Sequence, residues 1–238
     1  MEFKNNFTIE EVASFWTKLG ENYDEANEKF KEVHIQRYTE AIKYLELKPG
    51  DKVLNIWSRT GKAILFLRDK EQNIELHNFE VSDSFLKIAG QKFPKEIFAK
   101  TDLENLGFPN NYFDHILSLE TLEHTPNPSK LMKEFYRTLK PNGVLVMSLP
   151  PATAEPAEKI SRWFFGNHGE GPHKFLSSKT VKALLAGTGF KLVVHKGTLL
   201  IPFGPAWLMK LGEKIIDKFQ NSFISEMGIR QFYVARKL

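Results

Sequence analysis

The 238-residue chain contains no cysteine. That absence excludes disulfide frameworks, zinc or iron–sulfur sites held by cysteine, and cysteine nucleophiles. The chain also lacks any apolar run of about 18 residues, the length that a membrane-spanning helix needs. Its first segment, Met1 to Trp16, has no continuous apolar stretch of the kind found in signal peptides. These absences favour a soluble, cytoplasmic protein.

A large excess of charge of one sign is absent as well. The 33 Lys and Arg residues stand against 29 Asp and Glu, for a net charge of +4. Charged residues make up 26% and hydrophobic residues 42% of the chain, a balance that excludes disordered and multi-span membrane proteins. No basic stripe is interleaved with aromatic residues, so we predict no nucleic-acid partner.

Apolar periodicity predicts helices and strands in alternation along most of the chain. The predicted helices cover Glu10–Lys18, Ala26–Leu47, Gly61–Arg68, the segment after the capping residue Ser82, the segment that opens at Asn127-Pro128, Ser177–Gly187 and Pro205–Phe219. The predicted strands cover Val53–Ile56, Ile74–Phe79, Ile97–Ala99, Phe113–Leu119, Val144–Ser148, Phe190–His195 and Gln231–Ala235.

This alternation predicts an α/β fold with a doubly wound, mostly parallel sheet and right-handed crossovers. A ligand of such a sheet binds at the carboxyl ends of its strands. We expect a single domain, divided into an amino-terminal helical cap (1–46), a nucleotide-binding core (47–150), a lid insertion (151–175) and a carboxyl-terminal part that completes the sheet (176–238).

Short motifs within the core occur in a recognisable order. They are the strand and loop Val53–Gly61, Glu80 after the second strand, Thr101-Asp102 after the third, Gly107–Asp114, Leu122-Glu123-His124 and Leu139–Gly143. Together they resemble the class I S-adenosylmethionine-dependent methyltransferases, in particular the small-molecule branch that includes quinone-pathway enzymes. The resemblance covers roughly Leu47 to Pro150. It implies a Rossmann-like sheet of seven strands with the last strand inserted antiparallel, and methyl transfer from S-adenosylmethionine to a small acceptor.

The resemblance assigns cofactor contacts to several strand ends. Glu80 follows Gly61 by about 20 residues, the spacing at which an acid reaches a ribose in dinucleotide-binding folds. The resemblance therefore assigns Glu80 to the ribose, and Asp102 and Leu103 to the adenine. It adds Leu119, which ends the fourth strand, and Tyr23, whose segment folds over the cofactor in relatives. A plain alternative is a solvated acid at each strand end.

The glycine-rich loop departs from the family pattern. The family reads about V-L-D-I-G-C-G-T-G, whereas residues 53–61 here read V-L-N-I-W-S-R-T-G. Trp57 and Arg59 replace glycines, Asn55 replaces the loop acid, and Gly61 remains. Trp57 can turn into the core, both side chains can fill the methionine site, or Arg59 can bind a different, anionic ligand. The alternative function is thus a catalytically silent methyltransferase-like binding module.

Histidines are the candidates for removing a proton from the acceptor. His124 follows the fourth strand and His173 lies in the lid; helix capping or pocket lining is the competing interpretation for His124. The lid also supplies the candidate substrate contacts His168, Phe164 and Phe165. A flexible lid explains the spacing of His168 and His173 better than a metal cluster does, and we predict no metal.

The carboxyl-terminal helix carries Leu211, Ile215, Ile216 and Phe219 on one side and Lys210, Lys214 and Lys218 on another. Such a stripe is typical of a helix that packs on its own domain. It also suits an anionic membrane surface or a cover over a lipophilic acceptor. The partner that we expect is a small-molecule acceptor, and the sequence leaves the oligomeric state open.

Overall fold

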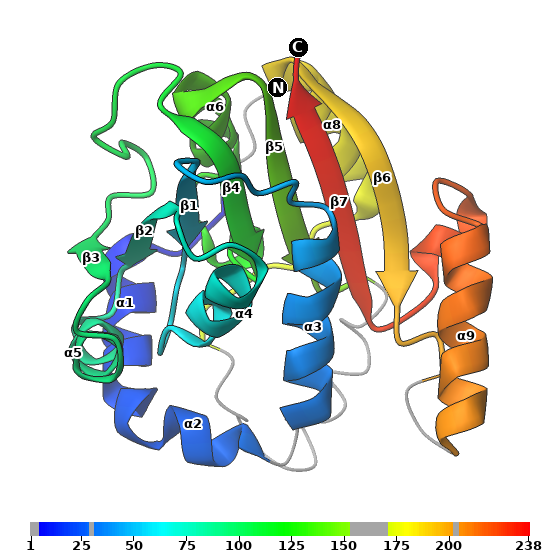
Figure 1. Cartoon of the computed structure of the whole chain (residues 1–238), viewed down its shortest axis with the longest axis horizontal. Helices are drawn as coiled ribbons and strands as arrows, with labels where there is room; N and C mark the ends of the chain where they lie inside the picture. Colours follow the sequence, from blue (N-terminus) through cyan, green and yellow to red (C-terminus); the bar gives the residue numbers. More distant parts are fainter. Residues whose placement is uncertain (1–4, 29–30, 153–170, 202–204) are drawn as a thin grey trace.

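The computed structural model describes residues 5–28, 31–152, 171–201 and 205–238. Seven strands form one sheet in the order β3-β2-β1-β4-β5-β7-β6 (Figure 1). They are β1 Lys52–Ile56, β2 Glu75–Glu80, β3 Ile97–Lys100, β4 Phe113–Leu119, β5 Leu139–Leu149, β6 Phe190–Thr198 and β7 Arg230–Lys237. Strand β7 lies between β5 and β6 and is antiparallel to both, whereas the β1, β2, β3, β4 and β5 pairings are parallel. The predicted Rossmann-like sheet with an inserted antiparallel strand is confirmed.

Helices cover both faces of this sheet. They are α1 Ile9–Leu19, α2 Tyr23–Ala26, α3 Lys31–Lys43, α4 Lys62–Lys70, α5 Asp83–Lys92, α6 Pro128–Thr138, α8 Ser178–Thr188 and α9 Ala206–Lys218. Short 3-10 turns occur at η1 Gly20–Asn22, η3 Leu122–His124 and η5 Phe223–Glu226. In Figure 1, α3 and α4 lie in front of the sheet and α6 and α8 behind it.

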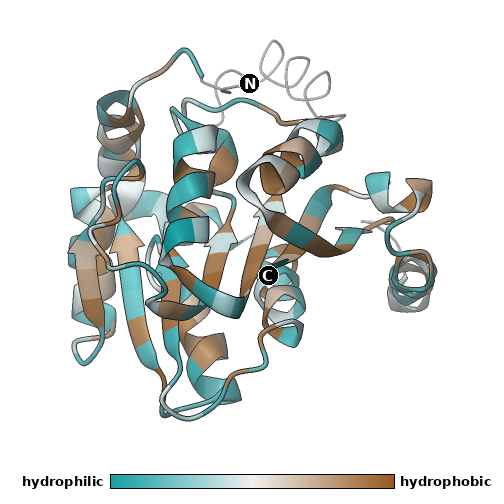
Figure 2. Cartoon of the chain, turned by 90° about the horizontal axis from the view of Figure 1, so that it is seen from above, coloured by the Kyte–Doolittle hydropathy of each residue, from teal (hydrophilic) through white to brown (hydrophobic). Residues whose placement is uncertain are grey.

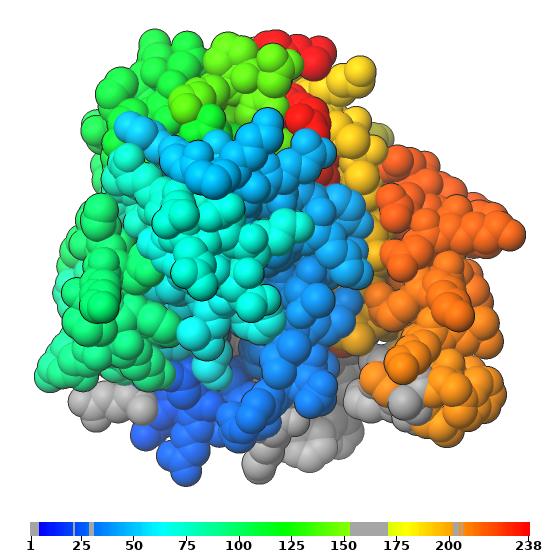
Figure 3. All heavy atoms as spheres, viewed as in Figure 1, coloured from blue at the N-terminus to red at the C-terminus, as the bar shows by residue number. Residues whose placement is uncertain are grey.

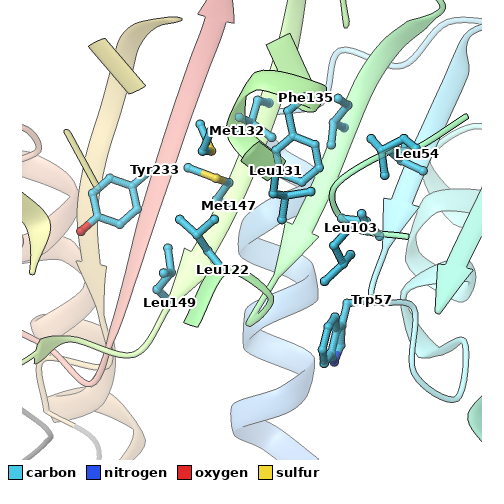
Figure 4. Close-up of a cluster of buried hydrophobic side chains, with 14 of the residues drawn as sticks. Leu54, Trp57, Leu103, Leu122, Leu131, Met132, Phe135, Met147, Leu149 and Tyr233 are labelled. Carbon is cyan, nitrogen blue, oxygen red and sulfur yellow. The ribbon is translucent and has the colours of Figure 1, made fainter. Parts of the chain in front are cut away.

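Strand alternation builds two hydrophobic cores. Successive side chains of a strand point to opposite faces, so neighbouring residues enter different cores. In β4, Ile116 joins the core beneath α6 and α8, and Leu117 joins the core beneath α3 and α4. In β7, Tyr233 likewise joins the first of these cores and Val234 joins the second. The first core also includes Trp57, which Figure 4 shows at its end near Leu103.

Two predicted boundaries differ from the structure. The helix expected over Ala26–Leu47 is observed as the shorter α3, Lys31–Lys43. Ala26 ends α2 instead, because the main-chain and side-chain nitrogens of Asn27 both donate to the Tyr23 carbonyl and cap α2. The strand predicted at Val144–Ser148 begins earlier in the structure, at Leu139, and its register against β4 shifts between Leu139 and Val144. None of the helices in the described ranges is long and apolar enough to cross a membrane.

The carboxyl ends of β1, β2 and β4 meet at the lower edge of the sheet in Figure 1. The segment α1–α2 runs beside this edge, and α1 packs on α5. The loop after β1, the first residues after β2 and the turn after β4 are thereby brought together under the amino-terminal segment. Most of the predicted lid, including His168, Phe164 and Phe165, lies outside the described residues.

Candidate functional site

The loop after β1 keeps a backbone path suited to glycine although it has lost two glycines. Trp57 and Arg59 adopt φ values of 61° and 51°, and Gly61 adopts 83°. At the end of β4, Glu120 is also left-handed, with φ of 53°. A left-handed non-glycine residue costs roughly 1–2 kcal/mol, and such strain is concentrated at functional sites. The chain therefore holds this loop geometry against the preference of its own side chains.

Glu80 fastens that loop to the end of β2. Its Oε2 accepts the main-chain N–H of Arg59 at 2.7 Å, and its Oε1 accepts the N–H groups of Val81 at 2.8 Å and Ser82 at 3.1 Å. The carboxyl is fully buried, and burial raises its pKa even though these three donors act in the opposite direction. Glu80 thus organises the backbone at the carboxyl edge, and its contact with a ribose stays a prediction.

Trp57 turns inward rather than into solvent. Its side chain is buried, and its ring stacks on His124 with centroids 5.7 Å apart and an interplanar angle of 17°. The ring of Trp16, from α1, also contacts His124. It lies edge-on to the imidazole, with ring centroids 5.6 Å apart. Trp57 therefore belongs to the hydrophobic core and also forms a wall of the site.

Arg59 fills the space that the amino-terminal segment covers. Its Nη1 donates to the Tyr23 hydroxyl at 2.9 Å, and its Nη2 donates to the Glu120 carbonyl at 3.3 Å. The guanidinium carbon lies 4.9 Å from the Trp16 ring centroid and 5.5 Å from that of Tyr23, within the range of cation–π attraction. The structure thus brings Tyr23 to the loop, and its partner there is a side chain of this protein.

A buried charge network behind the loop includes residues that the sequence reasoning missed. The Glu120 carboxylate accepts from Arg230 Nε at 3.0 Å and from the Ser148 hydroxyl at 2.9 Å. Burial alone raises the pKa of Glu120, but the positive charges of Arg230 and Arg37 outweigh it and hold that pKa at about 2. Glu120 therefore stays ionised and neutralises part of the cationic cluster.

The sequence held a signal for only one of these residues. Glu120 directly follows a buried strand, as Glu80 does at the end of β2, so the same strand-end rule identifies it. Arg230 carries no such signal, because its partner lies 110 residues away in the chain.

The two predicted catalytic histidines lie next to each other. Their rings are 5.8 Å apart, His124 Nδ1 lies 2.9 Å from the Pro172 carbonyl, and His173 contacts the Phe175 ring. Since a carbonyl only accepts, His124 Nδ1 carries the hydrogen of a neutral ring. Burial, followed by the charge of Arg59, lowers the pKa of His124 to about 3. His124 is therefore uncharged at neutral pH.

The remaining predicted residues divide between core and surface. Leu103 and Leu119 are buried, and the Asn55 amide donates to Asn78 Oδ1 at 2.8 Å across β1 and β2. Asp102 is exposed and accepts the main-chain N–H of Glu104 at 2.8 Å. The described residues contain no group of three His, Asp or Glu side chains that could hold a metal ion.

The space left at this edge is small. A cavity of about 10 Å³ lies among Arg37, Tyr38, Asn55, Trp57, Ser58, Arg59, Ala63 and Leu119. That volume holds about one water molecule, whereas ligand pockets usually measure roughly 300–1,000 Å³. A wider hollow of about 360 Å³, lined by Asn110, Lys133 and Lys237 among others, lies at the opposite edge of the sheet. The cavity beside Trp57 and Arg59 is therefore too small for the amino-acid tail of a nucleoside ligand.

The retained glycine has a steric reason as well as a conformational one. A Cβ on Gly61 would lie 2.8 Å from the Phe93 ring, whereas a Cβ on Gly50, which has a similar φ of 85°, would meet nothing within 4 Å. We expect Gly61→Ala to lower the free energy of unfolding by about 1–3 kcal/mol more than Gly50→Ala does, because only the first overpacks the core. Urea denaturation measures the difference; equal losses would contradict the steric argument.

Comparison with known proteins identifies methyltransferases among the relatives of this chain. A family profile described as a methyltransferase domain matches residues 56–147, from the end of β1 into β5. The phosphoethanolamine N-methyltransferase of Plasmodium falciparum is 27% identical over 235 residues, 96% of this chain and 83% of the relative. The biotin biosynthesis bifunctional protein BioHC of Teredinibacter turnerae is 30% identical over 159 residues, and the match covers 62% of this chain and only 28% of that protein.

A solved structure shares the fold across most of the chain. The phosphoethanolamine N-methyltransferase 2 of Haemonchus contortus, in complex with S-adenosyl-L-methionine, superposes with a TM-score of 0.62 at 17% identity. The match covers 85% of this chain and 52% of that one. At this identity the likeness concerns the fold, and the sequence matches carry the relationship.

Proposed function

Because the chain belongs to the class I S-adenosylmethionine-dependent methyltransferases, we propose that it transfers a methyl group from S-adenosylmethionine to a small, lipophilic acceptor. The observation that carries the proposal is the match to residues 56–147, which includes the altered loop, Glu80, Asp102 and the turn after β4. The cofactor supplies an activated methyl group on a sulfonium, so the protein has to align the acceptor and exclude water.

The cavity beside Trp57 and Arg59 is too small for the amino-acid end of the cofactor, and the proposal requires these side chains to move. The Arg59 guanidinium is held by two hydrogen bonds and two aromatic rings rather than by a carboxylate. Displacing it therefore breaks no ion pair with a described residue. We propose that the cofactor enters when Arg59 and Tyr23 separate, and that the backbone held by Glu80 stays in place.

An aromatic run beside the loop supports a lipophilic acceptor. Rings contact one another in sequence from Trp57 to His124, His173 and Phe175, with centroids between 5.0 and 5.8 Å apart. Such a surface favours a flat or apolar molecule. We propose His173 as the base for an acceptor with a removable proton. The other candidate, His124, has a pKa of about 3 and is too weakly basic for this task at neutral pH. His124 then positions Trp57 and the Pro172 carbonyl.

The second candidate function is a binding module without catalysis. The small volume between Trp57 and Arg59 favours it, since both side chains occupy the place where the family has glycine. Such a protein keeps the fold and the buried charge network and does not turn over the cofactor.

Calorimetric titration with S-adenosylmethionine and its demethylated product tests the proposal directly. We expect saturable heat with both ligands and a rise in melting temperature with each, because a ligand that binds only the folded state stabilises it. Neither heat nor a thermal shift at millimolar ligand would overturn the enzyme proposal and leave the silent module.

Asp102 offers a test of the nucleoside position that does not disturb the fold. We expect Asp102→Ala to weaken binding of both ligands by about tenfold, which corresponds to the loss of one hydrogen bond to a charged group. Asp83→Ala is the matched control, since Asp83 is an exposed acid whose ion-pair partner among the described residues is the exposed Lys100. Equal affinities for the two variants would contradict the assignment of Asp102 to the adenine.

A further inference from the structure

Helix α9 lies outside the sheet, beyond the edge strand β6 and away from the loop after β1 (Figures 1 and 2). It packs on the domain through a narrow inner face. Gly212 and Ile216 are buried there, Glu213 accepts the main-chain N–H of Leu199 at 2.6 Å, and Asp217 pairs with the buried Lys196. Both acids of the helix are therefore engaged with the body of the protein.

The outer face of α9 is apolar and exposed. Trp207 is 67% exposed, Leu211 44% and Phe219 41%, and Phe223 in the following turn η5 is 79% exposed. Single exposed apolar residues are common, but a gathering of large ones on one projecting element marks an interaction site. Figure 3 shows this region projecting from one side of the molecule. Of the stripe predicted to pack on the domain, only Ile216 is fully buried.

Lysines accompany the apolar stripe along the whole helix. Lys210, Lys214 and Lys218 recur every fourth residue, all are exposed, and none forms an ion pair within the described part of the chain. Their spacing places them in one row, directly beside Leu211 and Phe219. Because both acids of the helix are bonded to Lys196 and Leu199, the charges on the outer face that lack an ion-pair partner among the described residues are positive.

We propose that the outer face of α9, with η5, docks on an anionic membrane surface. Tryptophan, phenylalanine and leucine enter the boundary between headgroups and acyl chains, and flanking lysines pair with acidic headgroups. The charge row favours this occupant over a second copy of the chain. An isologous contact between two such faces brings one row of lysines against the other. The helix lies along the surface and does not cross it, because it has only 13 residues.

Vesicle flotation tests the proposal with the full chain. Two vesicle types are needed, one of phosphatidylcholine alone and one with about a third phosphatidylglycerol. We expect the protein to float with the anionic vesicles only, and to be released at high salt. The triple reversal Lys210→Glu, Lys214→Glu and Lys218→Glu should lower the partition coefficient by about a hundredfold or more. The pair Trp207→Ser and Leu211→Ser should lower it by at least about tenfold with an unchanged melting temperature.

The matched control reverses three exposed lysines at the other end of the sheet. Lys70→Glu, Lys87→Glu and Lys95→Glu change the net charge equally and lie on or next to α4 and α5. We expect the partition coefficient of this variant on anionic vesicles to stay within about twofold of that of the natural protein, because net charge far from the docking face has little effect on binding there. No binding by the natural protein, or equal losses in both triple variants, would overturn the proposal. A dimer in light scattering that Trp207→Ser and Leu211→Ser dissociate would assign the face to a second copy instead.

Discussion

Replacing Trp57 and Arg59 together by glycine should tighten the binding of S-adenosylmethionine by about a hundredfold. A ligand that enters the natural loop has to displace two hydrogen bonds and the cation–π contacts of Arg59. These contacts are together worth about 3 kcal/mol, and about 1.4 kcal/mol corresponds to a factor of ten. Glycine also supplies the left-handed backbone at both positions without strain.

The same variant should be less stable than the natural protein. Relief of two left-handed residues contributes roughly 1–2 kcal/mol each, but removal of a buried tryptophan usually costs about 3–5 kcal/mol. We therefore expect a lower melting temperature together with a higher affinity, which calorimetry and thermal unfolding measure on one sample. A lower melting temperature with a higher affinity indicates that the two side chains fill the binding site. A fall in both quantities indicates that the substitutions only destabilise the protein.

Asn142→Gly is the matched control for backbone relief. Asn142 has a φ of 64° and lies exposed in the irregular part of β5, far from the loop after β1. It should leave the affinity for the cofactor unchanged. Unchanged or weaker binding by the double variant would show that Trp57 and Arg59 form part of the binding surface. The single variant Arg59→Gly assigns the effect to one side chain.

In the loop after β1, some residues could be placed from the sequence and others could not. Glu80 and Gly61 could be placed, because a strand end and a turn that needs glycine are local features. The positions of Trp57 and Arg59 could not, since neither residue favours a left-handed backbone and propensity predicts that they avoid it. The partners of Arg59 lie 36 and 61 residues away in the chain. Only the assembled sheet brings Tyr23 and Glu120 to it.

Long-range packing also determines which face of helix α9 contacts the domain. The apolar spacing of α9 was visible in the sequence, but its inner face depends on Lys196 and Leu199 of the β6 region, which capture Asp217 and Glu213. The stripe alone could not show which side would face the domain. Sheet order was more accessible, because buried strands and intervening helices restrict the topology to a few arrangements.

Lowering the pH from 7 to 5 should destabilise the protein chiefly through two histidines, and His124→Phe should remove the share of that dependence that belongs to its own ring. Burial, followed in each case by the charge of a nearby arginine, lowers the pKa of both His124 and His34 to about 3. In the unfolded chain a histidine binds a proton near pH 6.5. Between these values the unfolded state holds more protons, so stability is fully present above pH 6.5 and falls as the pH decreases.

The expected magnitude is about 1.4 kcal/mol per pH unit for each histidine, or roughly 2 kcal/mol each between pH 6.5 and 5. Glu120 contributes little in this interval, because its pKa of about 2 and the ordinary value of 4.5 both lie below it. Urea denaturation at several pH values gives the slope for the natural protein and for His124→Phe.

The phenyl ring preserves the stacking on Trp57 and loses the hydrogen bond from His124 Nδ1 to the Pro172 carbonyl. That loss, about 1 kcal/mol, is independent of pH and is measured at pH 8, where both histidines are neutral in either state. His34→Asn should reduce the slope by a similar amount, and the two variants together should keep the part of the slope that comes from other buried groups, among them His115 and His195, whose pKa values burial also lowers. Equal slopes for the natural protein and His124→Phe would mean that the imidazole takes up its proton in the folded state, and His124 would then return as a candidate base beside His173.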